Sequence, residues 1–200
     1  MKYYLIIRKK EKPAFTLIEM IVSLGIIMVI SVIFIANYNS SNKRTDLIMT
    51  AQSLVADIHA AQNNALGLVR YGDEVPASGW GVNFNKLNNT YTIFADTSEQ
   101  NSSGYLLYDS SKGDTSFGAR QVVISGGLEI EEIKIFSTNS AVRDANNLNI
   151  TFLPPDPKTS IFSEDDRILG HMATIKLKEI GTNSSKTIRV NFLGLVEIID

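Results

Sequence analysis

The sequence predicts an α+β fold, in which a long N-terminal helix packs its second half on an antiparallel β-sheet head. An unbroken apolar run fills residues 15–36, and apolar residues recur at spacings of three and four between Leu47 and Leu68. From Gly79 onward, short segments alternate between apolar and polar residues. Helical spacing marks one buried face of a helix, whereas alternation marks strands with one face on a core and one in water.

A basic N-terminal segment and the apolar run after it predict a membrane anchor. The segment has one acid, Glu11, against the cations Lys2, Arg8, Lys9, Lys10 and Lys12. A helix over residues 15–36 is about 33 Å long, which is enough to cross a bilayer core. Positive charge before the span keeps the N-terminus in the cytoplasm, so the rest of the chain is exported. A secretory signal peptide is disfavoured because the run is too long and ends in Phe34-Ile35-Ala36, with a bulky ring near the cleavage position. An uncleaved anchor remains the alternative.

Glu19 argues against a passive anchor. It lies in the first turns of the span, where an unpaired carboxylate costs about 1–3 kcal/mol. An ionisable residue at such a position indicates a function, and its partner has to be identified. If the chain were cut before Phe15, the new α-amine would lie four residues from Glu19. Within one subunit or between neighbours, the amine and the carboxylate could then neutralise each other in lipid.

The segment Lys-Lys-Glu-Lys-Pro-Ala, then Phe15-Thr16-Leu17-Ile18-Glu19, then an apolar helix resembles the prepilin cleavage and methylation motif. Type IV pilins and the pseudopilins of type II secretion and DNA uptake share this motif. The resemblance implies cleavage between Ala14 and Phe15 by a prepilin peptidase and N-methylation of the Phe15 amine. It also implies that Glu19 sets the register of assembly by facing the amine of the next subunit. Ala14 stands where the family usually has glycine.

The chain is therefore expected to have four parts. They are a cytoplasmic leader at residues 1–14, a transmembrane helix at 15–36, an amphipathic helix at 37–70 and a β-rich globular head at 71–200. The strands expected in the head are Trp80–Phe84, Thr90–Phe94, Gln121–Ile124, Leu128–Phe136, Leu148–Leu153, Met172–Ile180, Thr187–Phe192 and Leu195–Ile199. Two Ser-, Asp-, Gly- and Pro-rich stretches, residues 101–117 and 154–167, are expected to be loops.

The last expected hairpin adds a second resemblance. The pattern Ile-Arg-Val-x-Phe-x-Gly-x-Val-x-Ile, after a helix rich in Ala, Gln and Asn, is similar to H-type minor pseudopilins and FimT-like minor pilins. This resemblance implies two antiparallel sheets against the helix.

The side chains give little sign of catalytic chemistry. The chain has no cysteine, which excludes disulfides, thiolate metal sites and a cysteine nucleophile. No zinc-protease, serine-hydrolase or phosphate-loop motif occurs, so we predict no enzyme and no cofactor. His59 is expected on the solvated helix face and His171 in a loop. Residues 164–166 and 144–147 offer oxygen ligands for calcium, but an exposed acidic loop and an Asn-rich turn are the favoured interpretations.

A DNA-binding head is the main functional alternative. Lys176, Lys178, Lys186 and Arg189 could form a basic strip, although Glu179 and Glu197 lie close by and favour a mixed, solvated face. The net charge of -2 provides no general attraction to nucleic acid. The resemblance implies a minor pilin or pseudopilin of the bacterial inner membrane, assembled into a filament for protein secretion. Its expected partners are prepilin peptidase, other pilins and membrane lipid, with secreted cargo or DNA at the head. A DNA-uptake subunit and an anchored β-domain of another function are the alternatives.

Overall fold

The structure is a computed structural model that describes residues 15–100, 102, 104–109, 120–138, 141–154, 158–163 and 168–199. The expected leader, with Ala14, and the acidic segment 164–166 lie outside the described residues. The chain divides into two compact units, residues 1–42 and residues 43–200. The fold class predicted from the sequence is confirmed: an apolar N-terminal helix is followed by helix and a large antiparallel sheet.

Helix α1 runs from Leu17 to Leu66. It begins after Thr16, whose hydroxyl accepts a hydrogen bond from the backbone N–H of Glu19 at 3.3 Å, as an N-cap residue does. After its end, Leu68 has a φ of 50°, in the left-handed region. The expectation that Leu68 continues the buried face of the helix was wrong, because the helix has already ended and Leu68 is 48% exposed.

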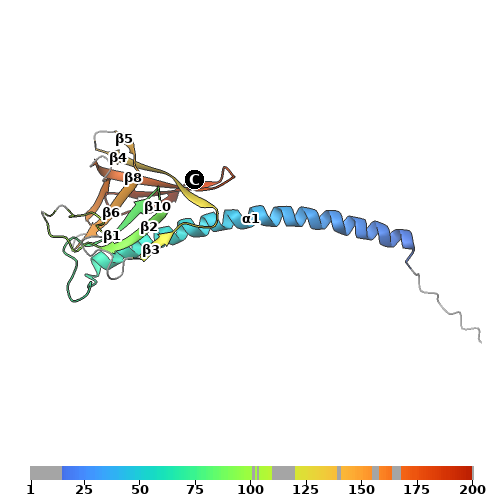
Figure 1. The fold of residues 1–200 in the computed structure, drawn as a ribbon, viewed down its shortest axis with the longest axis horizontal. Helices are drawn as coiled ribbons and strands as arrows, with labels where there is room; N and C mark the ends of the chain where they lie inside the picture. Colours follow the sequence, from blue (N-terminus) through green and yellow to red (C-terminus); the bar gives the residue numbers. More distant parts are fainter. Residues whose placement is uncertain are drawn as a thin grey trace, which may run out of the picture. The chain divides into compact units, whose positions relative to one another are not determined.

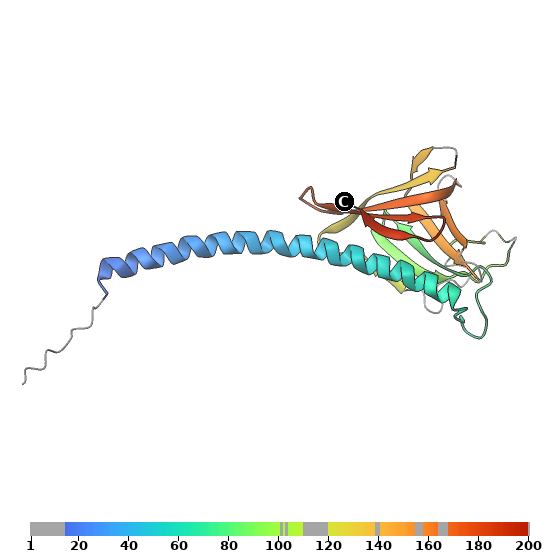
Figure 2. The same ribbon diagram turned by 180° about the vertical axis from the view of Figure 1, so that it is seen from behind.

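The described strands form one antiparallel network. In chain order they are β1 (Trp80–Asn85), β2 (Thr90–Ala95), β3 (Arg120–Val123), β4 (Leu128–Ser137), β5 (Val142–Asp144), β6 (Asn147–Leu153), β7 (Lys158–Ser163), β8 (Ile168–Glu179), β9 (Ser185–Asn191) and β10 (Val196–Ile199). Neighbouring strands follow the order β10-β9-β8-β7-β6-β1-β2-β3, and β4 with β5 branches from β8. Figure 1 and Figure 2 show this sheet curling over one side of the C-terminal half of α1.

Strand β8 joins the two parts of the network. Its first residues, Ile168–Gly170, pair with β7, whereas Met172–Lys178 pair with β9. Strand β4 pairs along the opposite edge of β8, from Gly170 to Glu179. The resemblance to H-type heads implied two sheets, but the described strands make one continuous sheet that forks where β8 exchanges one neighbour for another.

Two strands and one histidine were not placed correctly from the sequence. Strand β7 lies within a stretch that was expected to be a loop, because Ile161 is the single apolar residue among its three buried positions and three prolines come just before it. Strand β5 is short and all three of its residues are exposed, so it has no apolar alternation to detect. His171 lies inside β8 and not in a loop; it is the extra residue of a bulge opposite Phe136 and Ser137.

The core lies between the second half of α1 and the sheet. Every predicted residue of the helix stripe from Leu47 to Ala65 is at most 2% exposed: Leu47, Ala51, Leu54, Ile58, Ala61 and Ala65. They belong to one apolar cluster with inward residues of the sheet, such as Phe84, Ile150 and Phe152. This part of the helix prediction is confirmed, since burial of a one-sided apolar stripe is what stabilises a helix in water.

Two hydrogen bonds tie this half of α1 to the sheet, and a third ties the segment just after its end. The hydroxyl of Tyr91 in β2 donates to Asp57 Oδ2 at 2.7 Å, and the indole N–H of Trp80 in β1 donates to the carbonyl of Val69 at 3.1 Å. Gln62 Nε2 donates to the carbonyl of Gly194, in the turn between β9 and β10, at 3.4 Å. The helix is therefore held at β2 and at the turn between β9 and β10.

Substitution Tyr91→Phe is expected to lower the free energy of unfolding of the head by about 1.5 kcal/mol, because a partly buried hydrogen bond to a carboxylate is lost. The ring stays, so its contact with Phe84, at 6.0 Å between centroids, is kept. Urea unfolding followed by the fluorescence of Trp80, the single tryptophan, measures the change. Tyr105→Phe is the control, since no described residue bonds that hydroxyl; an equal loss there would contradict the assignment.

Candidate functional site

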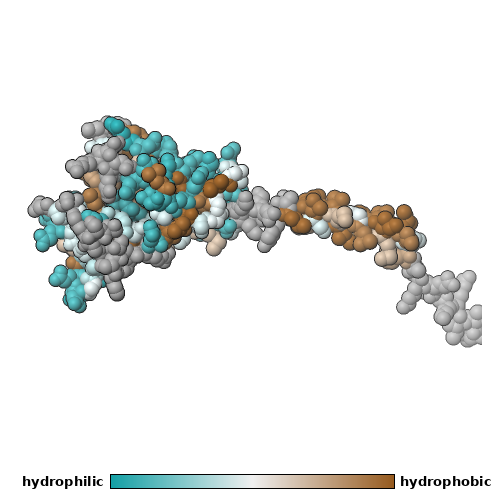
Figure 3. All heavy atoms as spheres, viewed as in Figure 1, coloured by the Kyte–Doolittle hydropathy of each residue, from teal (hydrophilic) through white to brown (hydrophobic). Residues whose placement is uncertain are grey.

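The N-terminal part of α1 has an apolar surface that no described residue covers. Residues Leu17–Ile35 have a mean hydropathy of 2.7, and none of this segment is buried. Phe15, Leu17 and Phe34 are 75%, 77% and 72% exposed. Figure 3 shows this surface in brown, whereas the head is largely teal and white. The segment is long and apolar enough to cross a membrane, and such a surface is stable only against lipid or other helices.

Glu19 is the single Asp, Glu, Lys or Arg between residues 13 and 42. It lies in the first turn of α1, three residues after the N-cap residue Thr16. The positive end of the helix dipole favours a carboxylate at this position. No described residue hydrogen-bonds or pairs with the Glu19 side chain. The first turn of the apolar helix therefore carries one negative charge whose partner must come from elsewhere.

The other polar side chains of this segment are satisfied within the helix. The hydroxyl of Ser23 donates to the carbonyl of Glu19 at 2.7 Å, and that of Ser31 donates to the carbonyl of Ile27 at 2.8 Å. A hydroxyl bonded to the preceding turn can face lipid without an outside partner. Glu19 differs from the serines, because no described residue hydrogen-bonds or pairs with its carboxylate.

In the head, most of the predicted basic strip is in ion pairs. Lys176 and Lys178 of β8 contact Glu131 at 2.8 Å and 2.7 Å. Glu131 reaches both because it is the extra residue of a bulge in β4, between Ile130 and Glu132. Arg189 Nε donates to Glu197 Oε1 at 2.7 Å across β9 and β10. The sequence pointed to Glu197 as a neighbour but gave no sign of Glu131, which the fold brings from a distant strand.

The two lysines shift the titration of Glu131. Hydrogen bonds from Lys176, which has the larger effect, and from Lys178 lower the pKa of its carboxyl from 4.5 to about 2. A lowered folded-state pKa gives stability that is fully present above the unfolded value and is lost as the pH falls through the folded value. The Glu131 contribution is therefore complete above pH 4.5 and disappears near pH 2.

Substitution Glu131→Gln is accordingly expected to lower the thermal unfolding midpoint at pH 7, with the difference from wild type shrinking between pH 4.5 and about 2. Thermal melts by circular dichroism across this range measure it. Glu74→Gln is the matched control, because Glu74 is exposed and its side chain makes no ion pair with a described residue. A difference that stays constant down to pH 2 would count against the ion-pair explanation.

The structure also shows where the candidate calcium ligands and His59 lie. No group of three or more His, Cys, Asp and Glu side chains suited to a metal occurs among the described residues. Asn147 Oδ1 accepts a hydrogen bond from Asn83 at 2.6 Å, and Asp144 lies in the exposed strand β5. His59 is exposed on α1, as predicted, with Nδ1 at 3.3 Å from Gln62 Oε1.

Comparison with known proteins supports the N-terminal site. The family model of the prokaryotic N-terminal methylation motif matches residues 10–35, which include Ala14, Phe15 and Glu19. Neither the curated proteins nor the solved structures gave a match to the chain. The apolar helix that starts at Leu17 fits a pilin anchored in the inner membrane. The chain thus carries a prepilin signal of the type IV pilin-like class, which indicates a structural subunit processed by prepilin peptidase and not an enzyme.

Proposed function

We propose that the chain is a minor pseudopilin or minor pilin of the H-type, assembled through α1 into a type II secretion pseudopilus or a related filament. The observation that carries this proposal is the single charge at Glu19 at the start of an exposed apolar helix. A helix that only anchors a head gains nothing from that charge. A helix that packs against identical helices can use it to select one register.

Processing would supply the partner of Glu19. Cleavage between Ala14 and Phe15 leaves an α-amine one residue before the N-cap residue Thr16. At that end of α1 the dipole is positive, so the new amine is unfavourable in lipid unless an acid lies close. In the proposal, Glu19 of one subunit faces the methylated Phe15 amine of the next. The four-part division at residues 14, 36 and 70 belongs to the same proposal.

The head would project from the membrane on the exported side. Its last hairpin, β9 with β10, carries the sequence pattern of the H-type resemblance and contacts α1 through Gln62 and Gly194. The alternative of a DNA-uptake subunit is less favoured, because Lys176, Lys178 and Arg189 are already paired with carboxylates. Protein secretion is therefore the proposed role, with the head contacting cargo or other minor subunits.

Intact-mass analysis of the chain from cells with and without prepilin peptidase tests the proposal. We expect the mass in peptidase-positive cells to correspond to residues 15–200 plus one methyl group. In peptidase-negative cells the full chain should remain. If the leader is retained in cells that process their other pilins, the Phe15 amine never forms and the proposed pairing with Glu19 is excluded.

A further inference from the structure

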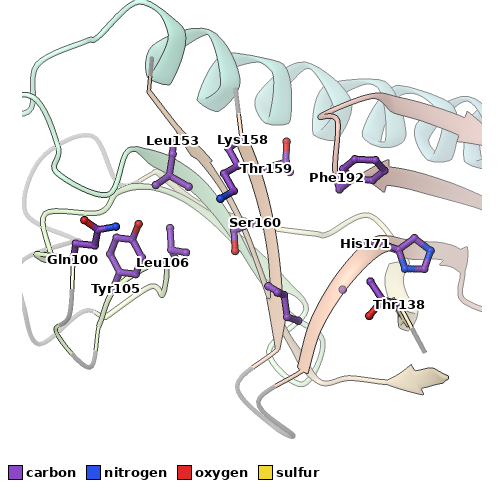
Figure 4. A pocket seen from close by; sticks show the side chains of 12 residues that line it. Gln100, Tyr105, Leu106, Thr138, Leu153, Lys158, Thr159, Ser160, His171 and Phe192 are labelled. Carbon is purple, nitrogen blue, oxygen red and sulfur yellow. The ribbon is translucent and has the colours of Figure 1, made fainter. Parts of the chain in front are cut away.

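A groove of about 640 Å³ lies in the head where β8 exchanges β7 for β9. We call it the fork groove and define it by six of its lining residues: Tyr105, Lys158, Ser160, Leu169, His171 and Phe192. Figure 4 shows Lys158, Thr159 and Ser160 between two groups of side chains. Tyr105 and Leu106 lie on one side of these residues, and His171 and Phe192 on the other. The filament proposal does not use this groove.

One wall of the groove is an open strand edge. The segment Lys158–Ser160 of β7 pairs with Thr151–Leu153 of β6, whereas β8 joins β7 only from Ile161. On the side opposite β6, no strand in the described part of the chain pairs with this segment. An unpaired strand edge presents backbone N–H and C=O groups, and these can hydrogen-bond an added strand.

Buried polar atoms at the groove also lack partners. Thr159 Oγ1, Ser160 Oγ and His171 Nδ1 are buried and hydrogen-bond no described residue. The bulge in β8 sets the position of His171, and the backbone N–H of Phe192 donates to the His171 carbonyl at 2.8 Å. Buried polar groups in folded proteins are nearly always paired, so ordered water or a bound molecule is expected to complete these three.

The charge and the apolar surface of the groove indicate which class of ligand it can bind. Lys158 and His171 are basic, and none of the described lining residues is acidic. The Lys158 side chain makes no ion pair with any described residue. Leu169 and Phe192 are 64% and 54% exposed. The groove therefore combines a cation, an apolar surface and an open strand edge, which together suit an extended chain with both acidic and apolar side chains.

We propose that the fork groove binds an extended peptide segment of a partner protein, with an acidic residue and an apolar residue two positions apart. The segment adds as a strand along Lys158–Ser160. Lys158 and Ser160 face the same side of β7, so a carboxylate on that side accepts a hydrogen bond from Lys158 Nζ. The apolar side chain, on the same face of the added strand, packs on Leu169 and Phe192.

Nucleic acid fits this groove less well. Binding of a phosphate backbone takes several cations in a row, and Lys158 is the only lysine or arginine among the described lining residues. Two residues of the basic strip predicted from the sequence, Lys176 and Lys178, are occupied by Glu131. A peptide also uses the backbone groups of the strand edge, which a nucleic acid would leave unpaired.

Fluorescence anisotropy with the full-length chain in nonionic detergent tests the proposal. The probe is a labelled short peptide with aspartate and leucine two positions apart, and the control peptide has lysine in place of aspartate. We expect the aspartate peptide to bind and the lysine peptide to bind roughly tenfold more weakly or worse. Lys158→Glu should lower the affinity by a similar factor, whereas Lys86→Glu, the same charge change outside the groove, should leave it unchanged.

Two further measurements separate strand addition from general attraction. Phe192→Ala should weaken binding about tenfold, and Leu193→Ala should not, because Leu193 is 67% exposed but does not line the groove. The peptide should also slow amide hydrogen exchange at Lys158–Ser160. Absence of binding by the aspartate peptide, or an equal loss in Lys86→Glu, would overturn the proposal. So would tighter, Lys158-dependent binding of a single-stranded DNA oligonucleotide.

The result of the peptide-binding measurement does not depend on whether the chain assembles into filaments. Glu19→Ala should leave the peptide affinity unchanged, since Glu19 is not among the groove residues. A chain that binds the peptide but does not assemble would refute the filament proposal alone. A chain that assembles normally but ignores the peptide would refute the fork groove alone.

Discussion

Replacing Glu19 by alanine is expected to remove the subunit from filaments while leaving its membrane insertion intact. Alanine is apolar, so the span from Leu17 to Ile35 becomes a better membrane helix. The drive to pair an isolated carboxylate in lipid, about 1–3 kcal/mol, is lost. That energy corresponds to a decrease in incorporation of roughly 5- to 150-fold. Immunoblots of the sheared-filament and membrane fractions measure both quantities.

Two further variants isolate the role of the charge. Glu19→Gln keeps the size and hydrogen-bonding capacity of the side chain without its charge, and we expect it to fail like alanine. Ser23→Ala is the matched control on the same helix, because the Ser23 hydroxyl bonds the Glu19 carbonyl and needs no outside partner. Normal incorporation of Glu19→Gln would show that charge pairing does not drive assembly.

Substitution Gly79→Ala is expected to destabilise the head by about 3 kcal/mol or more. Gly79 has a φ of +82°, and a Cβ atom there would overlap the carbonyl oxygen of Phe152. The backbone cannot easily move away, because Gly79 N–H donates to Pro76 at 3.1 Å and the Gly79 carbonyl accepts from Asp96 at 2.9 Å. Left-handed strain and overpacking each cost about 1–3 kcal/mol, and here they add.

The contrast with Gly72 makes this prediction specific. Gly72 also has a positive φ, +61°, but a Cβ atom added there would meet nothing within 4 Å. Gly72→Ala should therefore cost only the backbone strain, about 1 kcal/mol. Urea unfolding curves of the two variants, followed by circular dichroism, measure the difference. Equal stabilities would mean that the segment around Gly79 can shift away from Phe152.

The N-terminal site could be predicted from the sequence because its parts are adjacent in the chain. Thr16 and Glu19 lie within one helical turn, and the apolar run after them needs no tertiary contact to be recognised. The stripe from Leu47 to Ala65 was predictable for the same reason, since its period is a property of one helix. Both predictions rest on local order and not on the fold of the head.

The features of the head that could not be predicted from the sequence depend on contacts between distant segments of the chain. Strand β7 was missed because its pairing with β6 and β8, and not its own apolar pattern, makes it a strand. Glu131 meets Lys178 only through the bulge in β4. The fork groove likewise joins Tyr105, Ser160 and Phe192 from separate parts of the chain. No apolar period or motif spacing in the sequence predicts contacts between residues so far apart in the chain.

The place of β8 in the sheet also sets when the head can fold. Strand β8 is the partner of β4, β7 and β9, yet its residues, Ile168–Glu179, leave the ribosome after those of β4 and β7. A nascent chain that stops short of them leaves β4 and β7 each without one of their two neighbours. Pairing over such long sequence separations is slow, and it leaves strand edges exposed during synthesis. Chains interrupted before Ile168 should therefore be removed by proteases and not accumulate as partial heads.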